Sequence, residues 1–154
     1  MQRIATAALG AVLFTAAASA DDHDPKAVIE GVYAAFAAGE PDTFAAALHP
    51  DIVWNEAENL SYADGNPYEG PQAVMEGVIG RVMADWSSFA ATPEDMIAEG
   101  DRVVVLGRYT GVHAATGKPM DAQMVHVWTV RDGQAVSFQQ YVDTLQWFRA
   151  EQPG

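Results

Sequence analysis

The sequence predicts an α+β domain, in which a cone-shaped, strongly curved and mainly antiparallel sheet packs against three N-terminal helices and encloses a pocket. Two observations support this prediction. Apolar residues recur at helical spacing through most of the chain between residues 24 and 85, whereas long alternating strands separated by tight turns follow. A curved sheet closed by helices leaves a hollow, and ligands commonly bind in such hollows.

The first half of the chain contains the signals of three helices. Asp24–Pro25 is an N-cap followed by a first-turn proline, and the apolar stripe after it ends at Gly39. A second short helix is expected at about residues 42–48, where His49–Pro50 ends it. Apolar residues at helical spacing predict the third helix at residues 71–85.

The remaining chain is typical of strands. A short strand is expected at residues 52–58, followed by a polar, turn-rich loop at residues 59–70. Four longer strands are expected at about residues 87–98, 102–114, 120–130 and 134–143.

The last hairpin has two possible registers. A two-residue Asp132–Gly133 turn pairs His126 with Gln139, whereas a three-residue loop with Gly133 in a bulge pairs His126 with Phe138. The second register is favoured because it gives one face that is apolar apart from two polar groups. That face comprises Met124, His126, Trp128, Val130, Val136, Phe138, Gln140 and Val142.

The first twenty residues have the three parts of a secretory signal peptide. Arg3 is the positive region, residues 4–17 are apolar, and Ala18-Ser19-Ala20 is a small-residue cleavage site. The apolar stretch is about 14 residues long, whereas a membrane span needs roughly 20. We therefore expect a signal peptide at residues 1–20, a single domain at residues 21–154, and a periplasmic or secreted protein without a membrane anchor after cleavage.

Composition excludes several function classes. The formal net charge is −13 and no Lys/Arg cluster follows the signal peptide, so nucleic acid and anionic membranes are not expected partners. Cys is 0, so neither a disulfide framework nor a thiol nucleophile is available. The four histidines lack metal-ligand spacing and no Gly-rich phosphate loop occurs, so we expect no metal and no cofactor.

Five sequence segments carry a family resemblance, in the order Ala37–Glu40, His49–Trp54, Tyr68–Pro71, His126–Gly133 and Tyr141–Asp143. With them the chain resembles the SnoaL-like (polyketide-cyclase-like) branch of the nuclear transport factor 2-like superfamily, which includes the ketosteroid isomerases. The resemblance implies the cone-shaped fold but no single reaction, because this scaffold hosts isomerases, cyclases, dehydratases, hydrolases and binding modules. It also implies a homodimer through the outer face of the sheet, here Val125, Val127, Thr129 and Tyr141.

The resemblance implies two candidate catalytic residues. Glu56 falls where the isomerases carry their aspartate base, and a carboxyl group beside Trp54 in an apolar cavity would have a raised pKa. His126 falls near the isomerases' protonated oxyanion-hole acid and could donate a hydrogen bond to an enolate. The alternatives are an exposed strand-end carboxylate and a core histidine satisfied by a neighbour such as Gln140.

The chain also departs from the family's enzymes. Val32 matches the oxyanion tyrosine of the isomerases, and Tyr33, one step round the helix, is expected to point away. Gly107, Tyr109 and Gln140 stand where the limonene-epoxide hydrolases need an Arg and two Asp, so neither that hydrolysis nor strict steroid isomerisation is expected.

Two functions therefore remain open. The first is a cofactor-independent isomerase, cyclase or dehydratase that removes a proton next to a carbonyl. The second is a non-catalytic module that binds a small apolar ligand or a protein partner. In the first case the residues expected to contact the substrate are Trp54, Tyr109, Met124, Trp128, Phe138 and Gln140.

Overall fold

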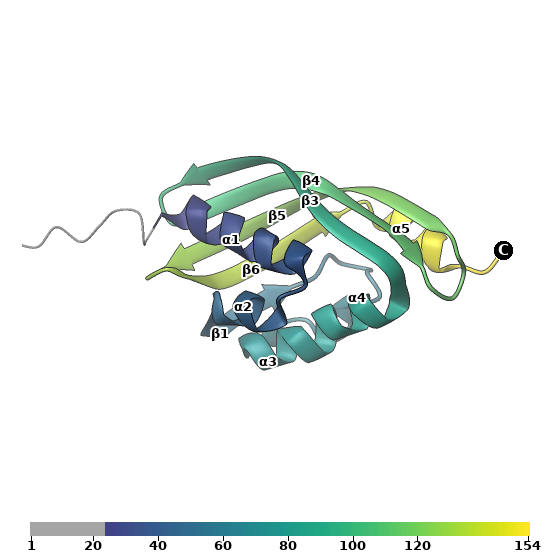
Figure 1. Cartoon of the computed structure of the whole chain (residues 1–154), viewed down its shortest axis with the longest axis horizontal. Helices are drawn as coiled ribbons and strands as arrows, with labels where there is room; N and C mark the ends of the chain where they lie inside the picture. Colours follow the sequence, from purple (N-terminus) through teal and green to yellow (C-terminus); the bar gives the residue numbers. More distant parts are fainter. Residues whose placement is uncertain (1–23) are drawn as a thin grey trace, which may run out of the picture.

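The computed structural model describes residues 24–154, so the predicted signal peptide at residues 1–20 lies outside the described residues. The described chain folds into helices that cover one side of a long, curved sheet (Figure 1). In chain order the elements are α1 (Pro25–Ala38), α2 (Pro41–Ala46), β1 (Leu48–Asn55), η2 (Ala63–Gly65), β2 (Tyr68–Glu69), α3 (Gly70–Val74), η3 (Met75–Ile79), α4 (Gly80–Asp85), β3 (Trp86–Glu99), β4 (Arg102–His113), β5 (Pro119–Arg131), β6 (Gln134–Val142) and α5 (Thr144–Glu151).

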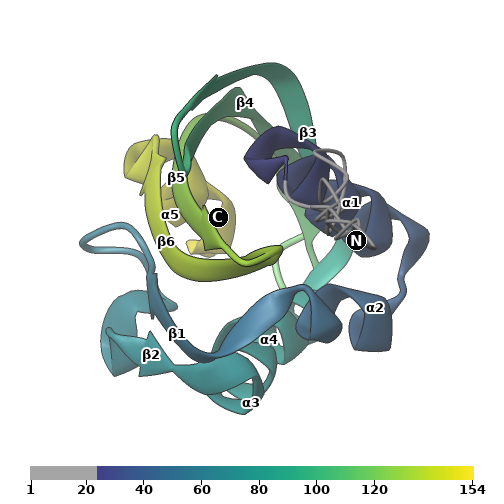
Figure 2. The same ribbon diagram turned by 90° about the vertical axis from the view of Figure 1, so that its left-hand side faces the viewer.

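The six strands form one mixed sheet in the order β2-β1-β6-β5-β4-β3. All neighbouring pairs are antiparallel except β1 and β6, which run parallel. Figure 2 shows the sheet curling around α1, with β1, α3 and α4 closing the lower side. The α+β cone predicted from the sequence is confirmed, although the sheet stays open, with β2 and β3 as its edges.

Irregularities in the longest hairpin help to bend the sheet. The pairing of β3 with β4 shifts register between Trp86 and Ser88 and again between Pro93 and Asp95. Such bulges bend a strand and increase its twist. Gly107 lies opposite Pro93, and a Cβ there would lie 2.2 Å from the Thr92 carbonyl oxygen, so only glycine fits this close approach.

The three predicted helices agree with the structure except at one boundary. The third predicted helix is confirmed as the continuous run α3, η3 and α4, in which η3 has π-helical geometry. The second helix ends at Ala46 rather than residue 48, because Leu48 already pairs with Ala135 of β6 and the Ala47 carbonyl accepts a hydrogen bond from the Ala135 N–H. That parallel pairing joins segments far apart in the chain, which local periodicity does not report.

The register of the last hairpin differs from the predicted one. Asp132 and Gly133 have φ of 49° and 78° and form a two-residue turn. The pairing of β5 with β6 shifts register away from this turn, between Thr129 and Val130. His126 therefore pairs with Gln140, and the predicted three-residue loop is wrong. Ala135 replaces Val136 on the buried face, while Phe138 and Gln140 keep their predicted side.

Helix α5 was not predicted from the sequence. Its N-cap is Asp143, whose side chain accepts hydrogen bonds from the backbone N–H groups of Leu145 and Gln146. Few apolar residues define its inner face, so the helix has little periodicity to detect. Its main anchor is Trp147, which is 2% exposed and packs against the rings of Tyr62, Trp86, Phe89 and Tyr109.

None of the helices between residues 24 and 154 is long and apolar enough to span a membrane.

Replacing Trp147 with alanine should destabilise the protein strongly. The change leaves a cavity among four aromatic rings, and truncating a buried Trp to Ala costs about 3–5 kcal/mol. Urea denaturation measures the free energy of unfolding. Leu145→Ala on the same helix is the control, because Leu145 is 53% exposed and its loss should change stability by less than about 0.5 kcal/mol. Equal effects of the two substitutions would contradict this role of α5.

Candidate functional site

A cavity of about 50 Å³ lies between the helices and the concave face of the sheet. Its walls are mostly apolar and include Phe36, Phe44, Trp54, Phe89, Phe138 and Trp147. Its polar lining consists of Tyr33, Glu56, Tyr109, His126 and Gln140. The structure therefore brings together six of the eight residues predicted for the site. The other two, Met124 and Trp128, are buried but do not line this cavity.

Glu56 follows directly after β1 and is held by both its backbone and its side chain. Its N–H donates to the Asn66 side-chain oxygen at 3.0 Å, and the Asn66 side-chain NH₂ donates to the Glu56 carbonyl at 2.9 Å. The Trp54 indole N–H donates to Glu56 Oε1 at 2.6 Å. These two hydrogen bonds to Asn66 hold the backbone of Glu56 as pairing with a neighbouring strand would, and the side chain of Glu56 lines the cavity.

The surroundings of Glu56 favour its protonated form. The residue is only 2% exposed, and this burial raises the pKa of its carboxyl group to about 7, although the side chains of Trp54 and Gln140 oppose the rise. A carboxyl group with a near-neutral pKa can both accept and release a proton near pH 7. The alternative of an exposed carboxylate at the strand end is therefore excluded.

His126 lies on β5 between two tyrosines. Its Nδ1 is 2.5 Å from Tyr33 Oη, and its Nε2 is 2.7 Å from Tyr109 Oη. Burial lowers the pKa of the imidazole to about 3, so the ring is neutral near pH 7. Both ring nitrogens have partners within the protein, but these partners are tyrosines rather than Gln140.

Tyr33 occupies a position that the sequence analysis assigned wrongly. It does not point away: its side chain is buried, lines the cavity and contacts His126. The apolar stripe of α1 includes Ile29, Val32, Tyr33 and Phe36, which is the i, i+3, i+4, i+7 pattern of a helix face. Val32 and Tyr33 therefore both face the core, and this spacing was the signal that could have identified Tyr33.

Each end of the tyrosine–histidine chain receives a hydrogen bond whose direction is fixed. The Ala57 N–H donates to Gln140 Oε1 at 3.1 Å, which orients the amide so that its Nε2 donates to Tyr109 Oη at 3.0 Å. At the other end, the Trp128 indole N–H donates to Tyr33 Oη at 3.3 Å. Each tyrosine oxygen is thus an acceptor for a group that can only donate.

Counting protons along this chain shows that one hydroxyl proton is left over. A neutral imidazole has one N–H donor and one nitrogen acceptor. In either tautomer, one of Tyr33 and Tyr109 donates to His126, and the other accepts from it and retains its own O–H. Within residues 24–154, neither hydroxyl has a further hydrogen-bond partner. Because both tyrosines line the cavity, this unused O–H is available to a ligand oxygen.

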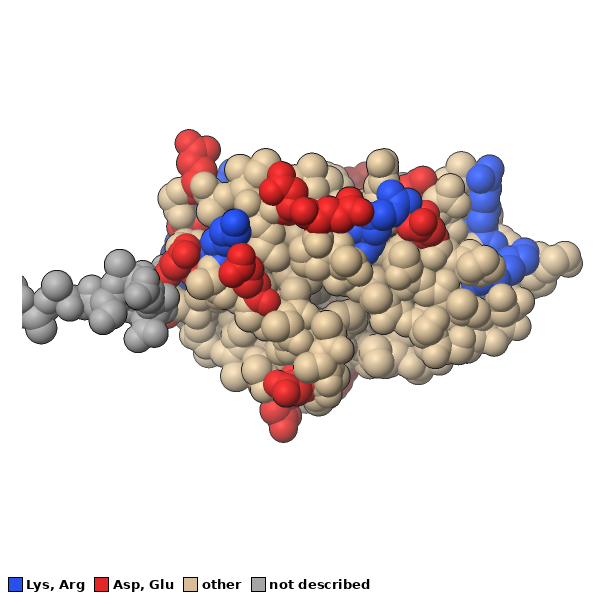
Figure 3. All heavy atoms as spheres, turned by 45° about the horizontal axis from the view of Figure 1, so that its top comes forward, with Lys and Arg blue, Asp and Glu red and all other residues tan. Residues whose placement is uncertain are grey.

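Both tyrosine hydroxyls are protonated near pH 7, and burial raises their pKa further above the usual value. Among residues 24–154 no Lys or Arg lines the cavity, so a negatively charged ligand would find no counter-ion from this part of the chain. Figure 3 shows Asp and Glu side chains spread over the exposed face with few Lys and Arg among them. In the part of the chain that the structure describes, no group of three or more His, Asp or Glu residues could hold a metal ion.

The family model of the SnoaL-like domain matches residues 29–138. The chain belongs to the SnoaL-like domain family. A comparison with curated proteins found no match.

Solved structures resemble this SnoaL-like protein along most of its length. An NTF2-like protein from Burkholderia thailandensis E264 is 30% identical with a TM-score of 0.80, and the alignment covers 84% of this chain and 98% of that one. TerC, co-crystallised with polyporic acid, is 27% identical with a TM-score of 0.74 and coverage of 82% and 96%. IdmH, a putative polyketide cyclase from Streptomyces antibioticus, is 24% identical with a TM-score of 0.72 and coverage of 83% and 98%, which shows a shared fold.

Glu56 should make stability depend on pH. Its folded-state pKa of about 7 lies above the ordinary value of 4.5. Its contribution to the free energy of unfolding is therefore complete below pH 4.5 and is lost as pH rises through 7. Urea denaturation of wild type and Glu56→Gln at several pH values should show the wild type losing about 3 kcal/mol relative to the variant across this window. The opposing contribution of His126 is present in both proteins and cancels. A pH-independent difference would contradict burial of an ionisable Glu56.

His126 should stay neutral in the folded protein at pH 5. Its depressed pKa of about 3 means that the ring takes up a second proton only in stronger acid. Long-range ¹H–¹⁵N correlation spectra distinguish the neutral from the charged imidazole, and the urea-unfolded chain is the control. A fully charged His126 at pH 5 in the folded protein would overturn this assignment.

Proposed function

We propose that this SnoaL-like protein is a cofactor-independent enzyme that moves a proton on the carbon next to a carbonyl group of a small apolar substrate. The observation that supports this proposal most strongly is the pairing of Glu56 with a spare tyrosine hydroxyl in one apolar cavity. The base and the hydrogen-bond donor needed for enolisation are both present there.

In this mechanism Glu56 removes the proton. The ionised carboxylate takes H⁺ from the α-carbon, and the electron pair of the C–H bond moves to form the enolate. Glu56, now protonated, returns the proton to another carbon in an isomerisation. In a cyclisation, the enolate carbon instead attacks a second carbonyl carbon, and the new alkoxide takes the proton. Because the pKa is about 7, a substantial fraction of the enzyme carries the carboxylate near neutral pH.

The enolate oxygen is stabilised by Tyr33 or Tyr109, whichever has the free hydroxyl proton. Such a donor is already oriented when charge develops, so no reorganisation is required. His126 has no N–H free for the substrate in this arrangement. The hydrogen bond to the enolate that was expected from His126 is therefore donated by a tyrosine. His126 and Gln140 then act as positioning residues that orient the two hydroxyls.

The relatives are consistent with this reading. TerC was co-crystallised with polyporic acid, which supports an organic molecule as the ligand of this protein. IdmH is described as a putative polyketide cyclase, and cyclisation through an enolate is one of the reactions proposed above.

Two further features belong to the proposal. We infer export through the signal peptide at residues 1–20, which places the mature enzyme in the periplasm or outside the cell. We also infer a homodimer through the outer face of the sheet, where Tyr141 and Leu106 expose apolar surface to solvent.

A non-catalytic binding module is the second candidate. The observation in its favour is the small cavity, about 50 Å³, whereas pockets for drug-sized ligands usually measure roughly 300–1,000 Å³. A module of this kind would bind its ligand through the same aromatic walls without using Glu56 as a base.

Deuterium exchange separates the two candidates. The wild-type enzyme in D₂O should exchange the α-protons of at least one member of a panel of cyclic ketones, as followed by NMR. Glu56→Gln should slow this exchange by about 10²–10⁴-fold. Glu58→Gln is the matched control, because Glu58 is exposed two residues away and should exchange at the wild-type rate. Ketone binding without any wild-type exchange, or equal rates in both variants, would favour the binding module.

A further inference from the structure

A second, larger cavity adjoins the first one. It has a volume of about 210 Å³ and lies between the end of α1, the start of α2 and the helical run η3–α4. Its described lining consists of Glu40, Gly39 and otherwise apolar side chains, which include the two methionines Met75 and Met83. This groove contains none of the polar groups proposed for catalysis.

Three side chains line both cavities, namely Phe36 from α1, Phe44 from α2 and Ile79 from η3. They form the partition between the inner cavity and the outer groove. The rings of Phe36 and Phe44 lie 6.2 Å apart, and Phe44 also contacts Trp54, whose indole holds Glu56. The partition therefore consists of side chains from three separate helices, and rotation of these side chains would join the two spaces.

We propose that the outer groove is a second subsite for the same ligand, and that Phe36, Phe44 and Ile79 form a gate between the two parts. The ligand would be an elongated, uncharged molecule with a carbonyl group at one end. The orientation, with the carbonyl inward, rests on the proposed function, whereas the existence of the subsite rests only on the two cavities.

The volumes support a ligand divided in this way. The inner cavity, about 50 Å³, has room for a small polar head beside Glu56 and the tyrosines. The groove is roughly four times as large, about 210 Å³ against 50 Å³, and takes the apolar body. In the described part of the chain, neither cavity is lined by a Lys or Arg, while each is lined by one glutamate, so the two sites disfavour a carboxylate or phosphate.

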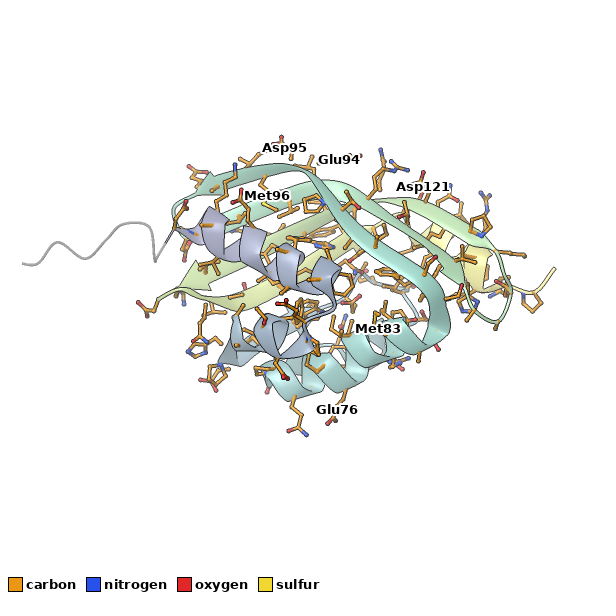
Figure 4. All side chains as sticks on the ribbon, in the orientation of Figure 1. Glu76, Met83, Glu94, Asp95, Met96 and Asp121 are labelled. Atoms are coloured by element: carbon orange, nitrogen blue, oxygen red, sulfur yellow. The ribbon has the colours of Figure 1, made fainter. Side chains whose placement is uncertain are left out.

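The wall of the groove is suited to apolar ligands of variable shape. Met83, labelled in Figure 4, belongs to α4, lines the groove and is 61% exposed. Methionine side chains are flexible and adapt to irregular partners. The gate residue Ile79 is the last residue of the π-helical segment η3. Such segments within α-helices occur frequently at functional sites.

A series of 2-alkanones tests the subsite, because the carbonyl stays at one end while the chain grows. Binding is measured by calorimetry from 2-butanone to 2-undecanone. Affinity should rise by up to about fourfold per added methylene until the groove is filled. Undecanoic acid should bind more weakly than 2-undecanone, because the described lining of the two cavities offers no counter-ion to its carboxylate. Affinity that does not change with chain length would overturn the proposal, as would tighter binding of the acid.

Two variants locate the effect. Met83→Lys places a charge on the groove wall and should flatten the dependence on chain length while leaving 2-butanone binding unchanged. Ile97→Lys is the matched control, since Ile97 is 56% exposed on β3 and should behave as wild type. Circular dichroism checks that both variants fold. Equal length dependence in Met83→Lys and wild type would contradict the groove as the binding place.

Methionine methyl spectra give an independent readout on the unmodified protein. With ¹³C-methyl methionine, 2-undecanone should shift the signals of Met75 and Met83, whereas 2-butanone should not. Met96 on β3 lies outside both cavities and serves as the internal control. Shifts of Met96 alone would count against the proposal.

The outcomes separate this inference from the proposed enzyme activity. Length-dependent binding without deuterium exchange would retain the subsite and reject the enzyme. Exchange of short ketones with length-independent binding would retain the enzyme and reject the subsite.

Discussion

The structure depends on one buried hydrogen-bond chain that crosses the whole fold. It runs from Trp128 through Tyr33, His126 and Tyr109 to Gln140, and Gln140 receives the Ala57 N–H after β1. These hydrogen bonds therefore link α1 to the strands β4, β5 and β6 and to the end of β1. An unpaired buried polar group costs about 1–3 kcal/mol, so these elements must take the positions that satisfy all members together.

The same apolar environment that stabilises the core creates the chemistry of the site. Burial of Glu56 raises the pKa of its carboxyl group to about 7, and burial keeps His126 neutral and both tyrosines protonated. In water a glutamate with the ordinary pKa of 4.5 would be a weaker base near pH 7. A charged carboxylate at this depth reduces the stability of the fold, which is a common compromise at functional sites.

Part of the site could be predicted from the sequence and part could not. Glu56 was predicted because it falls at the position of the aspartate base in the ketosteroid isomerases, and its side chain does contact Trp54. The faces of Phe138 and Gln140 were also predicted, although the register was wrong, because a two-residue turn followed by a bulge returns these residues to the buried side. Tyr33 was missed because a single helix position was considered instead of the whole stripe. Trp147 was missed because α5 is short and weakly periodic.

The α+β class, the order of most elements, the apolar character of the pocket and the presence of Glu56 and His126 in it could all be predicted from the sequence. These properties follow from local periodicity, turn residues and family resemblance. Three features could not be predicted in this way: the parallel pairing of β1 with β6, the tyrosines on either side of His126, and the two cavities that share Phe36, Phe44 and Ile79. The reason is that each of these features is a contact between segments distant in the chain, whose geometry is set by packing and by the need to satisfy buried polar groups.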